Sequence, residues 1–199
     1  MNLSHTENAY LPKAAVLDRV EAEIPEVSTF YWHFADPVEQ ERFHRFRPGQ
    51  FAQVSLFGVG EFPASLPPSP TETETFFTVR QVGSCTSALH QLRPGEVFGV
   101  RGPYGNGFPM EQYAGKNLVF VAGGIGLAPL RSVINYVLDR RGRRWIVVMV
   151  VNHANAQAAQ PALDALVEWV QARGTGEIYT YSVTRRGGPV PYCIAYVKL

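Results

Sequence analysis

The sequence predicts a two-domain protein in which an antiparallel Greek-key β-barrel is followed by a shortened α/β, Rossmann-like domain with a C-terminal β-hairpin. Short strand patterns separated by turn signals occupy the chain up to about residue 101. An apolar run at 118–121 then leads into glycines and a helical pattern. With 199 residues the chain is long enough for two small domains. We expect them at 11–111 and 112–172, with the hairpin in 173–199.

The first half of the chain has the strand spacing of a barrel. Its patterns predict strands at 14–21, 27–34, 51–56, 76–82 and 97–101, and a short helical turn at 87–92. In the second strand Phe30, Trp32 and Phe34 alternate with more polar residues, which predicts a buried aromatic stripe. Several short strands at this spacing favour a closed or Greek-key barrel over an open sheet.

The segment between the third and fourth of these strands divides into two parts. Residues 58–70 contain too many prolines for a central strand and too many apolar residues for a loose linker, so we expect a shaped surface. Residues 71–75 read Thr-Glu-Thr-Glu-Thr and have nothing to bury. They are predicted to form a solvated hairpin tip, and no function is assigned to them.

The second half is organised around a strand, a glycine turn and a helix. Four consecutive apolar residues at 118–121 are typical of a parallel strand covered on both faces. A helical stripe follows, made of Leu130, Val133, Ile134, Val137 and Leu138. The turn between them is Gly124-x-Gly126-x-x-Pro129, which lets the backbone approach a pyrophosphate and directs helix N–H groups at it. The alternative is a tight turn without a ligand.

The remaining chain predicts one more strand, one more helix and a hairpin. A buried strand at 145–151 completes a βαβ unit, for which a right-handed crossover is expected. A helix follows from Pro161. Strand patterns at 178–183 and 192–197 are joined by a turn-rich segment, and we expect them to pair as the hairpin.

Composition and charge favour a small-molecule ligand. The formal net charge of +1 gives no long-range field that favours nucleic acid or an anionic membrane. Neither a signal-peptide pattern nor a run of about 20 apolar residues is present, so we expect a cytoplasmic protein. Cys85 and Cys193 are far apart and the five histidines lack ligand spacing, so no metal site, iron–sulfur cluster or disulfide framework is expected.

Five motifs follow one another along the chain. They are Arg47-Pro48-Gly49-Gln50-Phe51, Glu61-x-Pro63-x-Ser65, Val79-Arg80-x-Val82-Gly83-x-x-Thr86-x-Ala88-Leu89, Arg101-Gly102-Pro103-Tyr104-Gly105-Asn106-Gly107-Phe108-Pro109 and Val121-Ala122-Gly123-Gly124-Ile125-Gly126-Leu127-Ala128-Pro129-Leu130. Residues 11 to about 140 thereby resemble one branch of the ferredoxin–NADP reductase superfamily. That branch contains the FAD-binding electron-transfer subunits of cytoplasmic hydrogenases, anaerobic sulfite reductases and dihydroorotate dehydrogenases.

The resemblance implies two cofactors, FAD and NAD(P)H, and a set of residues that bind them. The implied contacts are Pro63, Ala64 and Ser65 along the flavin ring; Arg80, Gly83 and Thr86 at the ribityl and pyrophosphate part of FAD; Gly124, Gly126 and Pro129 at the pyrophosphate of NAD(P)H; and Tyr104 and Gly105 near the contact of the two domains. No side chain is expected to be catalytic, because the flavin carries the redox chemistry. The alternative for Arg80 is an ordinary surface charge.

The resulting hypothesis is an NAD(P)H-linked FAD oxidoreductase, an electron-transfer subunit that serves a partner redox protein or larger complex. Two alternatives stay open: a non-catalytic flavin-binding or interaction subunit, and an acyl-CoA-associated accessory protein, because residues 168–199 are similar to the opening of small OB-fold domains. The second half also departs from the family, since Cys193 is followed by Ile194 and not by Gly-Pro. Asn152 and His153 favour neither NAD nor NADP.

Overall fold

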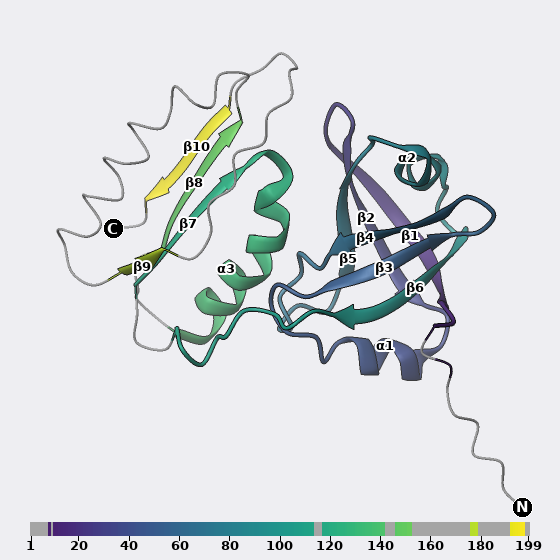
Figure 1. Cartoon of the computed structure of the whole chain (residues 1–199), viewed down its shortest axis with the longest axis horizontal. Coiled ribbons are helices and arrows are strands. Elements are labelled where there is room, and N and C mark those ends of the chain that lie inside the picture. Colours follow the sequence, from purple (N-terminus) through teal and green to yellow (C-terminus); the bar gives the residue numbers. More distant parts are fainter. Residues whose placement is uncertain are drawn as a thin grey trace, which may run out of the picture.

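The structure is a computed structural model that describes residue 8 and residues 10–113, 117–141, 146–152, 176–178 and 192–197. Two sheets lie beside each other, one in each half of the chain (Figure 1). The helix of the second half stands on the side of its own sheet that faces the first half, and its side chains form hydrogen bonds there. The two halves are therefore joined through this helix as well as through the chain.

The first half is a six-stranded antiparallel sheet in the order β4-β3-β6-β1-β2-β5. Its strands are β1 (Lys13–Ile24), β2 (Val27–Phe34), β3 (Phe51–Leu56), β4 (Gly60–Ser65), β5 (Thr75–Arg80) and β6 (Val97–Tyr104). The edge strands β4 and β5 contact each other, so the sheet curls round toward a barrel (Figure 1). The predictions for β2 and β3 are confirmed to the residue, whereas β1 and β6 run further than expected.

Aromatic residues fill the core that the curled sheet encloses. Phe30, Trp32 and Phe34 are at most 5% exposed, which confirms the predicted stripe. The Trp32 ring stacks on Phe77 with 4.9 Å between centroids and meets Phe98 edge-on at 6.0 Å. Such contacts add to the roughly 1.5–3 kcal/mol that burying each large apolar side chain contributes.

Two short helices accompany the sheet: α1 (Pro37–Phe43) and α2 (Ser84–Gln91). The sequence analysis missed α1, although its start carries an ordinary signal, an N-cap aspartate followed by proline. The Asp36 carboxylate accepts a hydrogen bond from the Val38 N–H at 2.9 Å. The helix then places Phe43 in the aromatic core. Helix α2 confirms the predicted helical turn and begins earlier, at Ser84.

The proline-rich segment 58–70 divides into two parts: residues 58–63 are exposed or half-buried, whereas residues 66–69 are buried. The prediction of a shaped surface is therefore wrong for 66–69 only. The segment supplies β4, and Pro63 is tolerated there because β4 lies at the end of the strand order. After the strand, Leu66, Pro67, Pro68 and Ser69 are all buried. Consecutive prolines restrict the backbone, and burial fixes their position further. The segment therefore forms a stiff, packed connection.

The second half confirms the predicted strand, glycine turn and helix. Strand β7 (Asn117–Gly123) leads through the 3-10 turn η1 (Gly124–Gly126) into α3 (Leu127–Arg141), and β8 (Ile146–Asn152) pairs parallel to β7. On α3 the residues Leu130, Val133 and Val137 of the predicted stripe are at most 5% exposed and pack against buried residues of β7. The βαβ unit is thus present as predicted.

The predicted C-terminal hairpin is described only in part, because residues 179–183 of its first strand lie outside the described residues. The described strands β9 (Gly176–Ile178) and β10 (Tyr192–Val197) lie at opposite edges of a four-stranded sheet in the order β10-β8-β7-β9. β9 pairs parallel to β7, and β10 pairs antiparallel to β8. Both segments have strand composition, but composition does not identify the partner strand. The helix predicted from Pro161 lies outside the described residues.

Candidate functional site

Three of the predicted site residues are at the end of β4. Pro63 is exposed and Ser65 half-buried, while Ala64 between them is buried, as the two-residue period of a strand requires. Ser65 pairs with Phe51 on β3, and Phe51 pairs with Tyr104 on β6. Paired residues of neighbouring strands share a face. Ser65, Phe51 and Tyr104 therefore form a partly open row across three strands.

The predicted residues Tyr104 and Gly105 end this row. The rings of Tyr104 and Phe51 are 5.9 Å apart between centroids. Gly105 has a φ of +83°, and an added Cβ would lie 3.3 Å from the Phe51 ring. The Gln50 side-chain amide donates a hydrogen bond of 2.7 Å to the Gly105 carbonyl. The positive φ therefore favours glycine here, and the space for a side chain is tight.

The first and fourth motifs of the sequence pack against each other. The Phe108 N–H donates to the Pro48 carbonyl at 2.8 Å. A Cβ on Gly49, whose φ is +84°, would lie 2.2 Å from the Phe108 ring. Phe108 also packs against the core of the second half. These two motifs, 47–51 and 101–109, consequently form one connection that leads from the first half into the second.

Arg80, Gly83 and Thr86 lie where β5 passes into α2. Arg80 is exposed and its guanidinium is 3.2 Å from the Glu26 carboxylate. Gly83 is the N-cap of α2, and an added Cβ would meet no atom within 4 Å. The Thr86 hydroxyl accepts from the N–H groups of Val82 and Gly83 and donates to the Gly83 carbonyl, at 2.9, 3.0 and 3.1 Å.

These contacts use the whole hydrogen-bonding capacity of the Thr86 hydroxyl, which has one donor and two acceptor sites. In this structure Thr86 therefore shapes the loop that starts α2. The prediction that its hydroxyl contacts FAD directly stays a prediction. Both readings of Arg80, ligand contact and surface charge, fit its exposed position beside Glu26.

Two motif residues without a predicted role, Glu61 and Arg101, form an ion pair across the sheet. The Glu61 carboxylate accepts from the Ser55 hydroxyl at 2.6 Å and from the Arg101 guanidinium. These residues come from β4, β3 and β6. The Ser55 hydrogen bond, together with the charge of Arg101, holds the pKa of Glu61 below its ordinary value despite some desolvation. The pair fastens the edge strand β4 to the sheet.

The predicted nucleotide loop is at the N-terminal end of α3. Gly126 is followed directly by the helix, and an added Cβ there would meet no atom within 4 Å. Pro129 is the third residue of α3, where its missing N–H costs little. The turn η1 contacts β5 of the first half. The open space at Gly126 is what a close approach of a pyrophosphate to the backbone needs, so this residue fits the predicted ligand.

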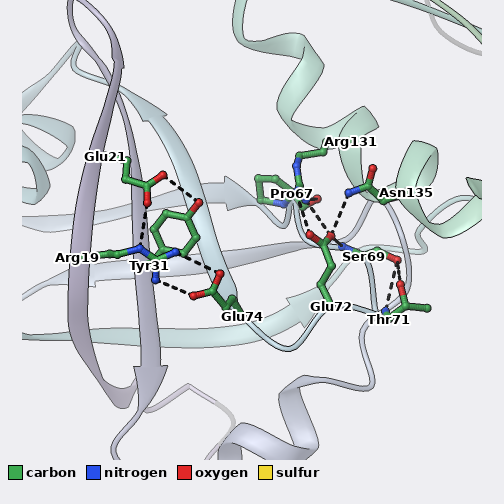
Figure 2. A network of polar contacts seen from close by, with 10 residues as sticks. All are labelled: Arg19, Glu21, Tyr31, Pro67, Ser69, Thr71, Glu72, Glu74, Arg131 and Asn135. Atoms are coloured by element: carbon green, nitrogen blue, oxygen red, sulfur yellow. Dashed lines mark hydrogen bonds and ion pairs between the residues drawn. The ribbon is translucent and has the colours of Figure 1, made fainter. Parts of the chain in front are cut away.

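Sequence analysis missed a second charged contact, between Glu72 and α3 (Figure 2). The Glu72 carboxylate receives two hydrogen bonds of 2.8 Å from the Arg131 guanidinium and one of 3.3 Å from Asn135. The prediction that 71–75 is a solvated tip is therefore wrong for Glu72. A separation of 59 residues between Glu72 and Arg131 leaves no local pattern that could reveal the pair.

In the part of the chain that the structure describes, no group of three or more His, Cys, Asp or Glu side chains could hold a metal ion. Across the same residues, no helix has the length and apolar character that crossing a bilayer would need.

Comparison with known proteins finds relatives in sequence and in fold. No protein-family model matches the chain. The gamma subunit of sulfhydrogenase 2 from Pyrococcus furiosus is 48% identical over 110 residues, which are 55% of this chain and 38% of that subunit. A probable electron transfer subunit of dihydroorotate dehydrogenase B (NAD(+)) from Methanothermobacter thermautotrophicus is 36% identical over 133 residues, 65% of this chain and 46% of that subunit.

Solved structures agree on the architecture. Ferredoxin–NADP+ reductase from Plasmodium falciparum has a TM-score of 0.59 at 13% identity, over 84% of this chain and 69% of that one. The fold is that of the ferredoxin–NADP reductases. The cytochrome P450 reductase GcoB from Amycolatopsis shares it, with a TM-score of 0.61 at 22% identity over 72% of this chain and 44% of that one.

These comparisons confirm the resemblance drawn from the five motifs. The chain spans 38–46% of the length of the two curated relatives. The similarity of residues 168–199 to an OB-fold domain stays unconfirmed. Its described strands β9 and β10 belong to the sheet of the second half.

Proposed function

We propose that this chain is the cofactor-binding part of a flavoprotein electron-transfer subunit, an NAD(P)H-linked FAD oxidoreductase that passes reducing equivalents between NAD(P)H and a partner redox protein. One observation carries the proposal: both candidate phosphate-binding turns lie along β5. Helix α2 follows β5 in the chain, and η1 contacts β5 from the other half. The names of the relatives, subunits of a hydrogenase and of a dihydroorotate dehydrogenase, support it.

In this proposal the protein binds and orients the two cofactors, and FAD, when bound, supplies the redox chemistry. Pro63, Ala64 and Ser65 would line the flavin ring, with Tyr104 and Gly105 beside them. Arg80 and Gly83 would hold the pyrophosphate of FAD, in a loop that Thr86 keeps in shape. Gly124, Gly126 and Pro129 would meet the pyrophosphate of NAD(P)H.

The finer description of the molecule belongs to the same proposal. It comprises an FAD-binding Greek-key barrel at 11–111, an NAD(P)-binding domain at 112–172, a cytoplasmic location and a larger oxidoreductase complex as partner. The chain spans less than half of either relative, so the activity of the whole subunit is part of the proposal.

The test is whether the purified protein carries FAD. We expect a yellow protein that releases FAD on denaturation, identified by chromatography. Arg80→Ala should weaken FAD retention without a comparable loss of folding stability, because Arg80 is exposed and takes no part in the core. A colourless protein that takes up no added FAD would contradict the proposal. Arg45→Ala is the matched control, since Arg45 is also an exposed arginine paired with a glutamate, but lies beside α1.

A further inference from the structure

The contact between Glu72 and α3 has more hydrogen bonds than an ordinary surface ion pair. Both Glu72 carboxylate oxygens accept from Arg131, which is the two-bond geometry that arginine forms with carboxylates. The second oxygen also accepts from the Ser69 N–H at 2.6 Å. Arg131 donates a further hydrogen bond to the Pro67 carbonyl at 3.2 Å and lies 4.9 Å from the centre of the Phe76 ring.

Partial burial reduces the screening of this ion pair but also costs desolvation energy. The side chains of Arg131 and Glu72 are 39% and 28% exposed, so solvent screens their attraction only in part. Burial raises the pKa of Glu72, but the hydrogen bonds from Arg131, the Ser69 N–H and Asn135 outweigh it, and the pKa lies below its ordinary value. Glu72 is therefore charged at neutral pH.

The Glu72–Arg131 contact lies close in the chain to both candidate binding sites. Glu72 follows the buried segment 66–69, which continues directly from the end of β4. Arg131 is two residues after Pro129 on α3, and Asn135 is one helical turn further. The segment after the proposed flavin strand is thus clamped to the first turns of the helix that starts with the proposed nucleotide loop.

We propose that Glu72, Arg131 and Asn135 are positioning residues that fix the orientation of the nucleotide loop relative to β4, and with it the rate at which NAD(P)H reduces the flavin. The fixed orientation of the nucleotide loop is inferred from the contacts of Glu72, Arg131 and Asn135 alone. The effect on the rate of flavin reduction rests on the proposed function. Since the Arg131 guanidinium contacts Pro67, Glu72 and Phe76, all in the first half, we assign it to connecting the two halves and not to binding phosphate.

A neighbouring carboxylate in the same segment provides the matched control (Figure 2). Glu74 receives hydrogen bonds of 2.7 and 3.2 Å from Arg19, which also lies over the Tyr31 ring. Arg19, Tyr31 and Glu74 all belong to the first half. Glu74→Gln therefore removes a charge two residues from Glu72 without touching the contact between the halves.

The orientation can be measured without any cofactor. Spin labels are attached at Val38→Cys on α1 and Ile125→Cys in η1, both exposed positions, after Cys85 and Cys193 are replaced by serine. We expect one narrow distance distribution by pulsed electron resonance. Arg131→Met and Glu72→Gln should broaden or shift it, and Glu74→Gln should not. An unchanged distribution in Arg131→Met would overturn the proposal.

The effect on the rate is measured in unlabelled protein by stopped-flow reduction with NADH and NADPH. Arg131→Met should lower the limiting rate about 10-fold or more with little change in nucleotide affinity, because misplacement near 1 Å can cost ~100-fold. Combining it with Glu72→Gln should add little further loss, since both remove one contact. Additive losses would contradict a shared role.

The two measurements separate the possible failures. If the unsubstituted protein binds no FAD, the proposed function fails, while the distance measurement still decides whether the contact sets the orientation. If Arg131→Met broadens the distances but the flavin is reduced at the original rate, the positioning role in the reaction is overturned and the proposed function stands.

Discussion

At the scale of single residues, several polar side chains hold the site together. The Thr86 hydroxyl joins three backbone groups at the start of α2, and the Glu61 carboxylate joins β4 to two neighbouring strands. Sequence motifs located both residues but did not separate ligand contacts from structural ones. A hydroxyl in a glycine-containing loop suits either role, and only the geometry shows that this one is already saturated.

Thr86→Val should therefore affect folding as well as FAD retention. The substitution keeps the shape of the buried side chain but removes three hydrogen bonds to an exposed loop, where water can replace part of them, and we expect a loss of about 0.5–1.5 kcal/mol in the free energy of unfolding. Thr86→Ser, which keeps the hydroxyl, should lose much less. Urea denaturation measures both, and equal stability of the valine variant and the original protein would contradict the loop-shaping role.

Glu61 predicts a dependence of stability on pH. Its pKa in the folded protein lies below the value of an unpaired glutamate, so its contribution is present above about pH 4.5 and lost as the pH falls through the folded pKa. The stability gap between the original protein and Glu61→Gln should be constant from pH 7 to 5 and narrow below. Urea titrations at pH 7, 5 and 4 check this. If the difference in the free energy of unfolding widened as the pH fell, the predicted direction of the Glu61 pKa shift would be wrong.

At the scale of elements, the sequence predicted those whose pattern is local. The alternation of β2 and the stripe of α3 come from one buried face each, and both are confirmed. Strand β4 was missed because Pro63 argues against a central strand, and nothing in the sequence shows that this strand lies at an edge. The pairing of β9 with β7 and of β10 with β8 was not predicted for a related reason, because each partner strand is distant in the chain.

At the scale of the whole molecule, function depends on how the two halves meet. The connection through Gly49 and Phe108 and the contact through Glu72 and Arg131 both tie the second half to the first. Neither could be predicted, because each joins residues far apart in sequence. The two candidate sites stay predictions, although the turns that carry them could be located from the sequence because glycine turns beside strands are local features.

NAD(P)H is expected to bind weakly and to reduce the flavin slowly, even where FAD is held well. The loop at Gly124 to Pro129 can meet a pyrophosphate, but rate and affinity also need groups that position the ribose and the nicotinamide. Anaerobic stopped-flow mixing with NADH and NADPH, following the bleaching of the flavin, measures both quantities.

Gly126→Val tests whether the reduction that remains uses this loop. The new side chain would meet no protein atom near its Cβ, so the fold should tolerate it, yet it would occupy the space through which a pyrophosphate approaches the backbone. We expect reduction by NAD(P)H to be abolished, while the yellow colour and reduction by dithionite persist. Fast, tight reduction by the original protein would instead mean that β9 and β10 complete a working nucleotide domain, because they are the strands that widen its sheet on either side of β7 and β8.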